Sequence, residues 1–146
     1  MVLEAIDKNG NKIIFNEKDL IGQITVLYFY PKDNTSGCTK EACDFRDNLN
    51  RLVSYATVIG VSPDSVASHI KFQQKHGLNF TLVADIEHTL AEKYGVWKEK
   101  SMYGRKYMGI ERSTFIINAQ GKMEKEWRKV KVSGHVDEIL SALKSM

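Results

Sequence analysis

A run of seven uncharged, mostly apolar residues, Ile24 to Tyr30, places the strongest constraint on how this chain folds. Such a run of β-branched and aromatic residues is typical of a buried strand. Pro31 ends it, because proline cannot donate to a sheet ladder. After a short polar loop, apolar residues recur at three- and four-residue steps from about Thr39 to Ser54, which predicts an amphipathic helix. A buried strand that leads into a helix indicates an α/β fold with a parallel centre.

The rest of the chain continues this alternation. Asn9-Gly10 lies between two short apolar segments, 3–6 and 12–15, and predicts a hairpin. Strands are predicted at 57–61, 81–83, 112–117 and 122–128, and helices from the turn at 62–65 to His76, at 85–94, and at 133–144 with Ser133 as the cap. Residues 96–108 carry many charges and are expected to form an irregular loop or a short extra element. The pattern predicts one α/β domain over residues 1–146, with a central mixed β-sheet flanked by helices and an N-terminal β-hairpin.

Charge and hydropathy exclude several classes of function. The net charge is +3, and basic residues alternate with acidic ones, whereas nucleic-acid binders concentrate basic charge on one face. The densest basic stretch, 128–131, is interpreted as a solvated strand end. No apolar run approaches the ~20 residues that span a bilayer, and the first ten residues lack the apolar core of a secretory signal. We expect a cytoplasmic protein with no nucleic-acid or membrane partner.

Cys38 lies where the polar loop meets the predicted helix. A cysteine in the first turn of a helix faces unpaired backbone N–H groups and the positive end of the helix dipole. Both favour the thiolate, which is the nucleophilic form. An isolated cysteine is more often a small buried apolar residue. Here the polar neighbours favour an exposed loop, and Gly37 allows the backbone to approach a ligand closely. We therefore predict that Cys38 is a reactive thiol.

The second cysteine, Cys43, is separated from Cys38 by four residues. On a continuous helix the two side chains would point about 140° apart, with an axial rise of about 7.5 Å. A disulfide needs Cα atoms roughly 4.4–6.8 Å apart, so this bond requires the start of the helix to unravel. The spacing is not Cys-x-x-Cys, which disfavours a dithiol of the thioredoxin type. The histidines are scattered and form no zinc pattern with the cysteines: His69, His76, His88 and His135.

The spacing Pro31-x-x-x-Thr35-x-x-Cys38 resembles the peroxiredoxin signature. The run from Cys38 to Cys43, together with residues 94–97 and 109–115, resembles the branch called peroxiredoxin Q or bacterioferritin-comigratory protein. The resemblance covers nearly all of the chain. It implies a thioredoxin-like fold and a thiol-dependent peroxidase that reduces hydrogen peroxide and organic hydroperoxides without a metal, haem or flavin.

The resemblance also implies a catalytic cycle. Cys38 would be the peroxidatic cysteine: its thiolate attacks one peroxide oxygen, displaces water or alcohol, and becomes a sulfenic acid. Cys43 would be the resolving cysteine and would close an intramolecular disulfide with Cys38. A thioredoxin-like dithiol would then reduce that disulfide by exchange. Since this branch is often monomeric, a monomer is expected, with a weak dimer as the alternative.

Three further residues gain roles from the resemblance. The hydroxyl of Thr35 would donate to the thiolate and accept from the peroxide, and it could also cap the helix. Arg112 would lie beside the loop and stabilise the thiolate, although without the motif a surface arginine on a strand would be the favoured interpretation. Pro31 would fix the loop and shield the thiol, beyond ending the strand.

Two more residues complete the predicted site. The backbone N–H groups of Gly37 and Cys38 would hold the negative charge that develops on oxygen. Glu41 would either orient the arginine or complement the helix N-terminus, and the sequence does not distinguish these roles.

Two other functions remain open at this point. One is a disulfide oxidoreductase of thioredoxin fold, which would turn over disulfides without peroxide. The other is a non-enzymatic redox sensor that uses the same fold. Consumption of peroxide that depends on Cys38 would separate the peroxidase from both.

Overall fold

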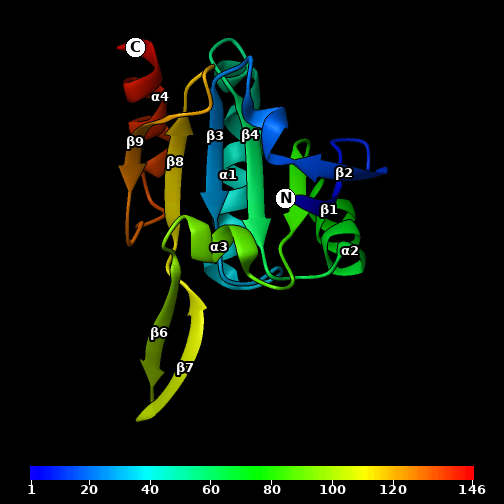
Figure 1. The fold of residues 1–146 in the computed structure, drawn as a ribbon, viewed down its shortest axis with the longest axis vertical. Coiled ribbons are helices and arrows are strands. Elements are labelled where there is room, and N and C mark those ends of the chain that lie inside the picture. Colours follow the sequence, from blue (N-terminus) through cyan, green and yellow to red (C-terminus); the bar gives the residue numbers. More distant parts are fainter.

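The computed structural model describes residues 1–146 as a seven-stranded sheet with helices on both faces and a separate two-stranded sheet (Figure 1). The strands are β1 (Val2–Ile6), β2 (Lys12–Asn16), β3 (Thr25–Phe29), β4 (Thr57–Ser62), β5 (Thr81–Ala84), β6 (Trp97–Met102), β7 (Arg105–Ile110), β8 (Ser113–Ile117) and β9 (Met123–Trp127). The helices are α1 (Ser36–Leu52), α2 (Val66–His76), α3 (Thr89–Lys93) and α4 (His135–Lys144), with a 3-10 helix η1 (Glu17–Leu20). None of the helices combines the length and apolar character that a membrane crossing requires.

The large sheet has the strand order β2-β1-β5-β4-β3-β8-β9. Its centre is parallel, since β4 pairs in parallel with both β3 and β5. The outer strands pair antiparallel, including the N-terminal hairpin of β1 and β2. The expected mixed sheet with flanking helices and an N-terminal hairpin is therefore confirmed.

Apolar side chains pack on both faces of this sheet. On one face, α1, α2 and α4 contribute Phe45, Phe72 and Ile139 to the larger cluster. On the other face, η1 and α3 contribute Leu20 and Leu90 to a second cluster. All five residues of β3 are buried, as expected for a strand covered on both faces.

The register around β3 determines which loops meet at its carboxyl end. Phe29 is opposite Val61 of β4 on one side and Ser113 of β8 on the other. Because β8 runs antiparallel to β3, the residue before Ser113 lies beside the residues that follow Phe29. This register brings Arg112 to the loop that carries Cys38.

The segment 96–108, expected to be a loop or a short extra element, is a β-hairpin. Strands β6 and β7 pair over their full length around a two-residue turn in which Tyr103 and Gly104 have positive φ values, 52° and 76°. This is the backbone geometry of hairpin turns that glycine favours. The hairpin projects from the body of the protein (Figure 1). The two strands were not predicted individually because most side chains on both faces are exposed, so no apolar alternation marks them.

Three predicted helix boundaries also differ. α1 begins at Ser36, three residues before Thr39. α3 covers only 89–93 of the expected 85–94, because both Asp85 carboxylate oxygens accept backbone N–H groups, from Leu90 and Ala91. α4 begins at His135 after Gly134, whose φ is 77°, so Ser133 is not its cap.

Candidate active site

Cys38 is the third residue of α1, directly after the loop that leaves β3. Its thiol is free, and its side chain is 2 % exposed. The expectation of an exposed thiol is therefore wrong: the neighbouring loop residues Asn34 to Ser36 are exposed, but the helix turns the sulfur inward. The sulfur is nonetheless in contact with a charged group, so it is not enclosed in hydrocarbon.

The first turn of α1 keeps its N–H groups unpaired. Thr35 is the N-cap residue, but its side chain makes no capping hydrogen bond. The Thr35 hydroxyl instead donates to the carbonyl oxygen of Lys32 at 2.8 Å. The predicted donation from Thr35 to the thiolate is therefore wrong, because its one hydrogen is used elsewhere, and only its lone pairs stay available. The N–H groups of Gly37 and Cys38 have no partner within the protein.

Arg112 joins the helix start to the sheet. It precedes β8, and its two terminal nitrogens diverge to different partners: Nη2 lies 3.2 Å from the sulfur of Cys38 and Nη1 lies 2.6 Å from Oε1 of Glu41. A Cβ atom at Gly37 would lie 3.2 Å from Nη2, so glycine leaves room for the guanidinium. Burial of Arg112 opposes its charge, but Glu41 and Cys38 outweigh that effect and raise the pKa of Arg112.

Glu41 is 1 % exposed and lies one helical turn after Cys38. Burial raises the pKa of this carboxyl to about 7, while Arg112 acts in the opposite direction. Oε1 accepts from Arg112, and Oε2 has no partner. Of the two roles left open by the sequence, this contact favours orientation of the arginine.

The raised pKa of Glu41 predicts a specific pH dependence of stability. The folded state holds the proton between the ordinary value of 4.5 and about 7, so the free energy of unfolding falls as the pH rises through this window. At about 1.4 kcal/mol per pKa unit, wild type should lose about 3 kcal/mol relative to Glu41→Gln. Urea unfolding from pH 4.5 to 8 measures this difference. Glu87→Gln, at an exposed position, is the control, and parallel pH profiles for wild type and Glu41→Gln would contradict the assignment.

The remaining predicted residues lie near the same point of the fold. Pro31 follows β3 directly after Tyr30 and is half-buried. Cys43 is half-buried on α1, and α1 is helical through both cysteines. Both thiols are free, in agreement with the geometric argument that an intact helix keeps them apart.

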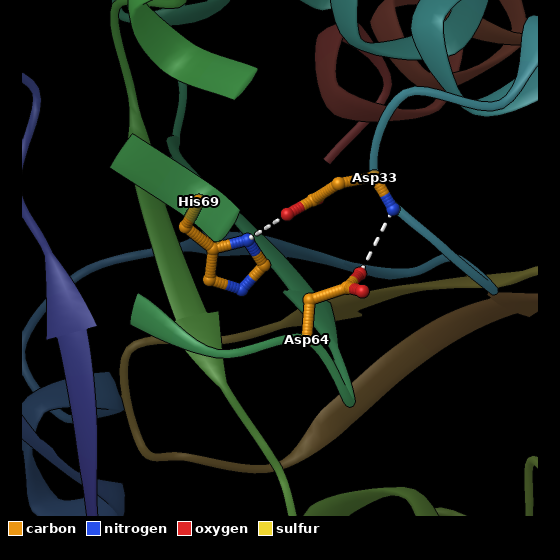
Figure 2. Close-up of side chains that lie close together, drawn as sticks. All are labelled: Asp33, Asp64 and His69. Carbon is orange, nitrogen blue, oxygen red and sulfur yellow. Dashed lines mark hydrogen bonds and ion pairs between the residues drawn. The ribbon is translucent and has the colours of Figure 1, made fainter. Parts of the chain in front are cut away.

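Sequence reasoning missed a buried polar cluster behind the loop. Asp33, Asp64 and His69 come from the loop, the end of β4 and α2, and they point toward one another (Figure 2). Only one signal was present: His69 shares a helix face with Val66 and Phe72, both apolar, which marks a buried position. The 36-residue separation of Asp33 and His69 hides their contact from any local pattern.

A thiol at the start of the helix that follows a central parallel strand, hydrogen-bonded by a guanidinium, defines a thiol enzyme of thioredoxin-like fold. Residues 3–126 match the AhpC/TSA family. The chain therefore belongs to the AhpC/TSA family. Its relatives there are named peroxiredoxins, so the protein is a thiol-dependent peroxidase.

Individual relatives support this placement. The chain is 57% identical over 129 residues to "Peroxiredoxin Bcp" of Bacillus subtilis, a match that covers 88% of this chain and 82% of the relative. A mutant of Xanthomonas campestris peroxiredoxin Q superimposes with a TM-score of 0.91 at 42% identity, covering 99% of this chain and 90% of the other. A second Xanthomonas structure, of the bacterioferritin comigratory protein, gives 0.87 at 43% identity, covering 98% and 90%.

Proposed function

We propose that this protein reduces hydrogen peroxide and organic hydroperoxides, with Cys38 as the peroxidatic cysteine. The contact of 3.2 Å between Arg112 Nη2 and the Cys38 sulfur carries the proposal, because it favours the thiolate. The Xanthomonas bacterioferritin comigratory protein has an alkyl peroxide reduction activity. That relationship supports organic hydroperoxides as a second class of substrate.

The chemical step follows from the groups around the sulfur. The thiolate attacks the nearer peroxide oxygen, the O–O bond breaks, and the farther oxygen leaves with a proton as water or alcohol. Arg112 and the free N–H groups of Gly37 and Cys38 stabilise negative charge on the oxygens as the bond breaks. The Thr35 hydroxyl accepts the O–H of the peroxide with a lone pair, since its own hydrogen is bound to Lys32. Pro31 limits access of water to the thiol.

The second step joins the two cysteines. The first turns of α1 unwind, the Cys43 thiol attacks the sulfenic acid of Cys38, and water leaves as the disulfide forms. We propose that a thioredoxin-like dithiol then reduces this disulfide by exchange, so no bound cofactor is used.

Intact mass after one equivalent of peroxide tests this cycle. Wild type should lose two hydrogens as the internal disulfide forms. Cys43→Ser should instead gain one oxygen, because its sulfenic acid cannot be resolved within the chain. The rate of its first oxidation should stay within about twofold of wild type, while recycling by thioredoxin falls and over-oxidation rises.

Ser54→Ala, in the turn after α1, is the control and should form the disulfide as wild type does. If Cys43→Ser recycles normally, then another thiol resolves the sulfenic acid. If wild type itself shows no mass change with peroxide, the peroxidase cycle is wrong.

A further inference from the structure

The carboxylate of Asp33 lies at the centre of a buried hydrogen-bond cluster under the active-site loop (Figure 2). It accepts from the Tyr30 hydroxyl at 2.6 Å, from the Ser68 hydroxyl at 2.8 Å and from Nδ1 of His69 at 2.7 Å. The side chains of His69 and Asp33 are 0% and 1% exposed. These three contacts fix the orientation of the Asp33 side chain.

Both ring nitrogens of His69 have a partner. Nε2 lies 3.0 Å from the carbonyl oxygen of Val83, which can only accept, so Nε2 carries a proton. Nδ1 lies 2.7 Å from Oδ2 of Asp33. Asp33 and His69 therefore form a buried hydrogen-bonded pair that fixes the ring on both sides.

The same residues have the donor types of a metal site, since oxygen and nitrogen atoms of Asp33, Asp64 and His69 lie within 4.8 Å of one another. The hydrogen bonds already occupy these atoms. Nδ1 and Nε2 of His69 face Asp33 and Val83, and Oδ2 of Asp64 accepts from the Ser62 hydroxyl at 2.6 Å and from the Asp33 N–H at 2.8 Å. A metal ligand must present a free lone pair. The cluster is therefore a structural clamp on the loop.

The clamp fixes the residue just before the segment that unwinds for disulfide formation, which is the start of α1. Asp33 is held through its side chain by α2 and through its N–H by Asp64, which follows β4. The next residue, Asn34, is exposed and has a φ of 62°, in the left-handed region that asparagine adopts more readily than most residues. Thr35, the exposed N-cap residue, bonds the carbonyl of Lys32 and leaves the helix without a side-chain cap. The buried side-chain contacts of the loop therefore end at Asp33.

We propose that the buried Asp33–His69 pair is the positioning element of the active-site loop, and the fixed point from which the start of α1 unwinds and refolds. This inference rests on the proposed peroxidase cycle. With the pair intact, Thr35 and the free N–H groups of the first turn are held in place for attack on peroxide. Unwinding for disulfide formation is then confined to residues after Asp33.

Rapid-quench mass spectrometry of Asp33→Asn and His69→Gln tests the inference, since it separates oxidation of Cys38 from disulfide formation. Without the Asp33–His69 contact, the oxidation step should slow about tenfold, because small displacements of positioning groups have large effects on rate. The disulfide step should stay as fast or become faster, because unwinding meets less restraint. Ser68→Ala, which removes one donor only, should give a smaller change in the same direction and serves if the other variants do not fold.

Asp85→Asn is the matched control, since Asp85 is also a buried carboxylate but caps α3 instead of the loop. It should leave the ratio of the two rates unchanged. In wild type, nitrogen NMR of His69 should show both ring nitrogens in hydrogen bonds, and a ring nitrogen without one would overturn the clamp.

If the loop variants oxidise as fast as wild type, or if both steps slow in equal proportion, the clamp does not position the loop. If wild type and every variant fail to consume peroxide, the proposed function fails instead.

Discussion

Cys38→Ser is expected to abolish peroxide consumption while leaving the fold intact. Serine occupies nearly the same volume, but its hydroxyl is not ionised near neutral pH and is a weak nucleophile without an activating base. Peroxide loss under reductant, measured over the first turnovers, should fall to the background rate of the buffer. Circular dichroism and the unfolding midpoint should stay close to those of wild type, because the replacement removes little buried apolar surface.

Cys43→Ser is the matched control for this experiment. It also removes a thiol from α1, yet it should retain the first turnover. Residual peroxidase activity in Cys38→Ser above the background would mean that a different group attacks the peroxide. In that case the contact between Arg112 and Cys38 would have no catalytic meaning.

Arg112→Met is expected to slow oxidation of Cys38 by about a hundredfold. The change removes the only guanidinium in contact with the sulfur, and the loss of one preorganised donor at a reacting centre has an effect of about this size. The second-order rate constant for peroxide should fall at neutral pH and recover in part at higher pH, where more of the thiol is ionised. A stopped-flow measurement over pH 5 to 9 records both effects.

Two variants complete the test of Arg112. The double variant Arg112→Met with Glu41→Gln avoids a buried, unpaired carboxylate and should be better folded but equally slow. Arg46→Met, at an arginine bonded to His76 and Asp47 away from the thiol, should react as wild type does. A rate for Arg112→Met within twofold of wild type would show that the thiolate needs no help from this residue.

Much of the sheet could be predicted from the sequence because its strands are buried. The uncharged run that became β3 and the Asn9-Gly10 hairpin each carry a local signal for their conformation. The β6–β7 hairpin carries none, since it has no buried face to impose an alternation. The start of α4 was misplaced for a different reason: Gly134 in the left-handed region replaces the side-chain cap that Ser133 was expected to provide.

The site residues likewise fall into those that a local pattern predicts and those that depend on contacts between distant segments. Cys38 and Glu41 belong to one short segment, so their spacing on a helix predicts that they meet. Arg112 could be named only through its motif, because its approach depends on the pairing of Phe29 with Ser113. Asp33 and His69 escaped notice because no motif includes them and their contact joins a loop to a distant helix. The inward orientation of the sulfur likewise depends on where α1 begins, which the sequence places three residues too late.

A backbone hydrogen bond joins the two ends of the β6–β7 hairpin, and it determines where the length of the chain can change. The N–H of Glu111 donates to the carbonyl oxygen of Val96 at 2.8 Å, so the chain leaves the body and returns to it at adjacent points. Residues inserted or deleted at the exposed tip around Tyr103 would lengthen or shorten the projection without changing the register of β8. Variants with a longer or shorter β6–β7 hairpin would therefore keep the contact between Arg112 and Cys38.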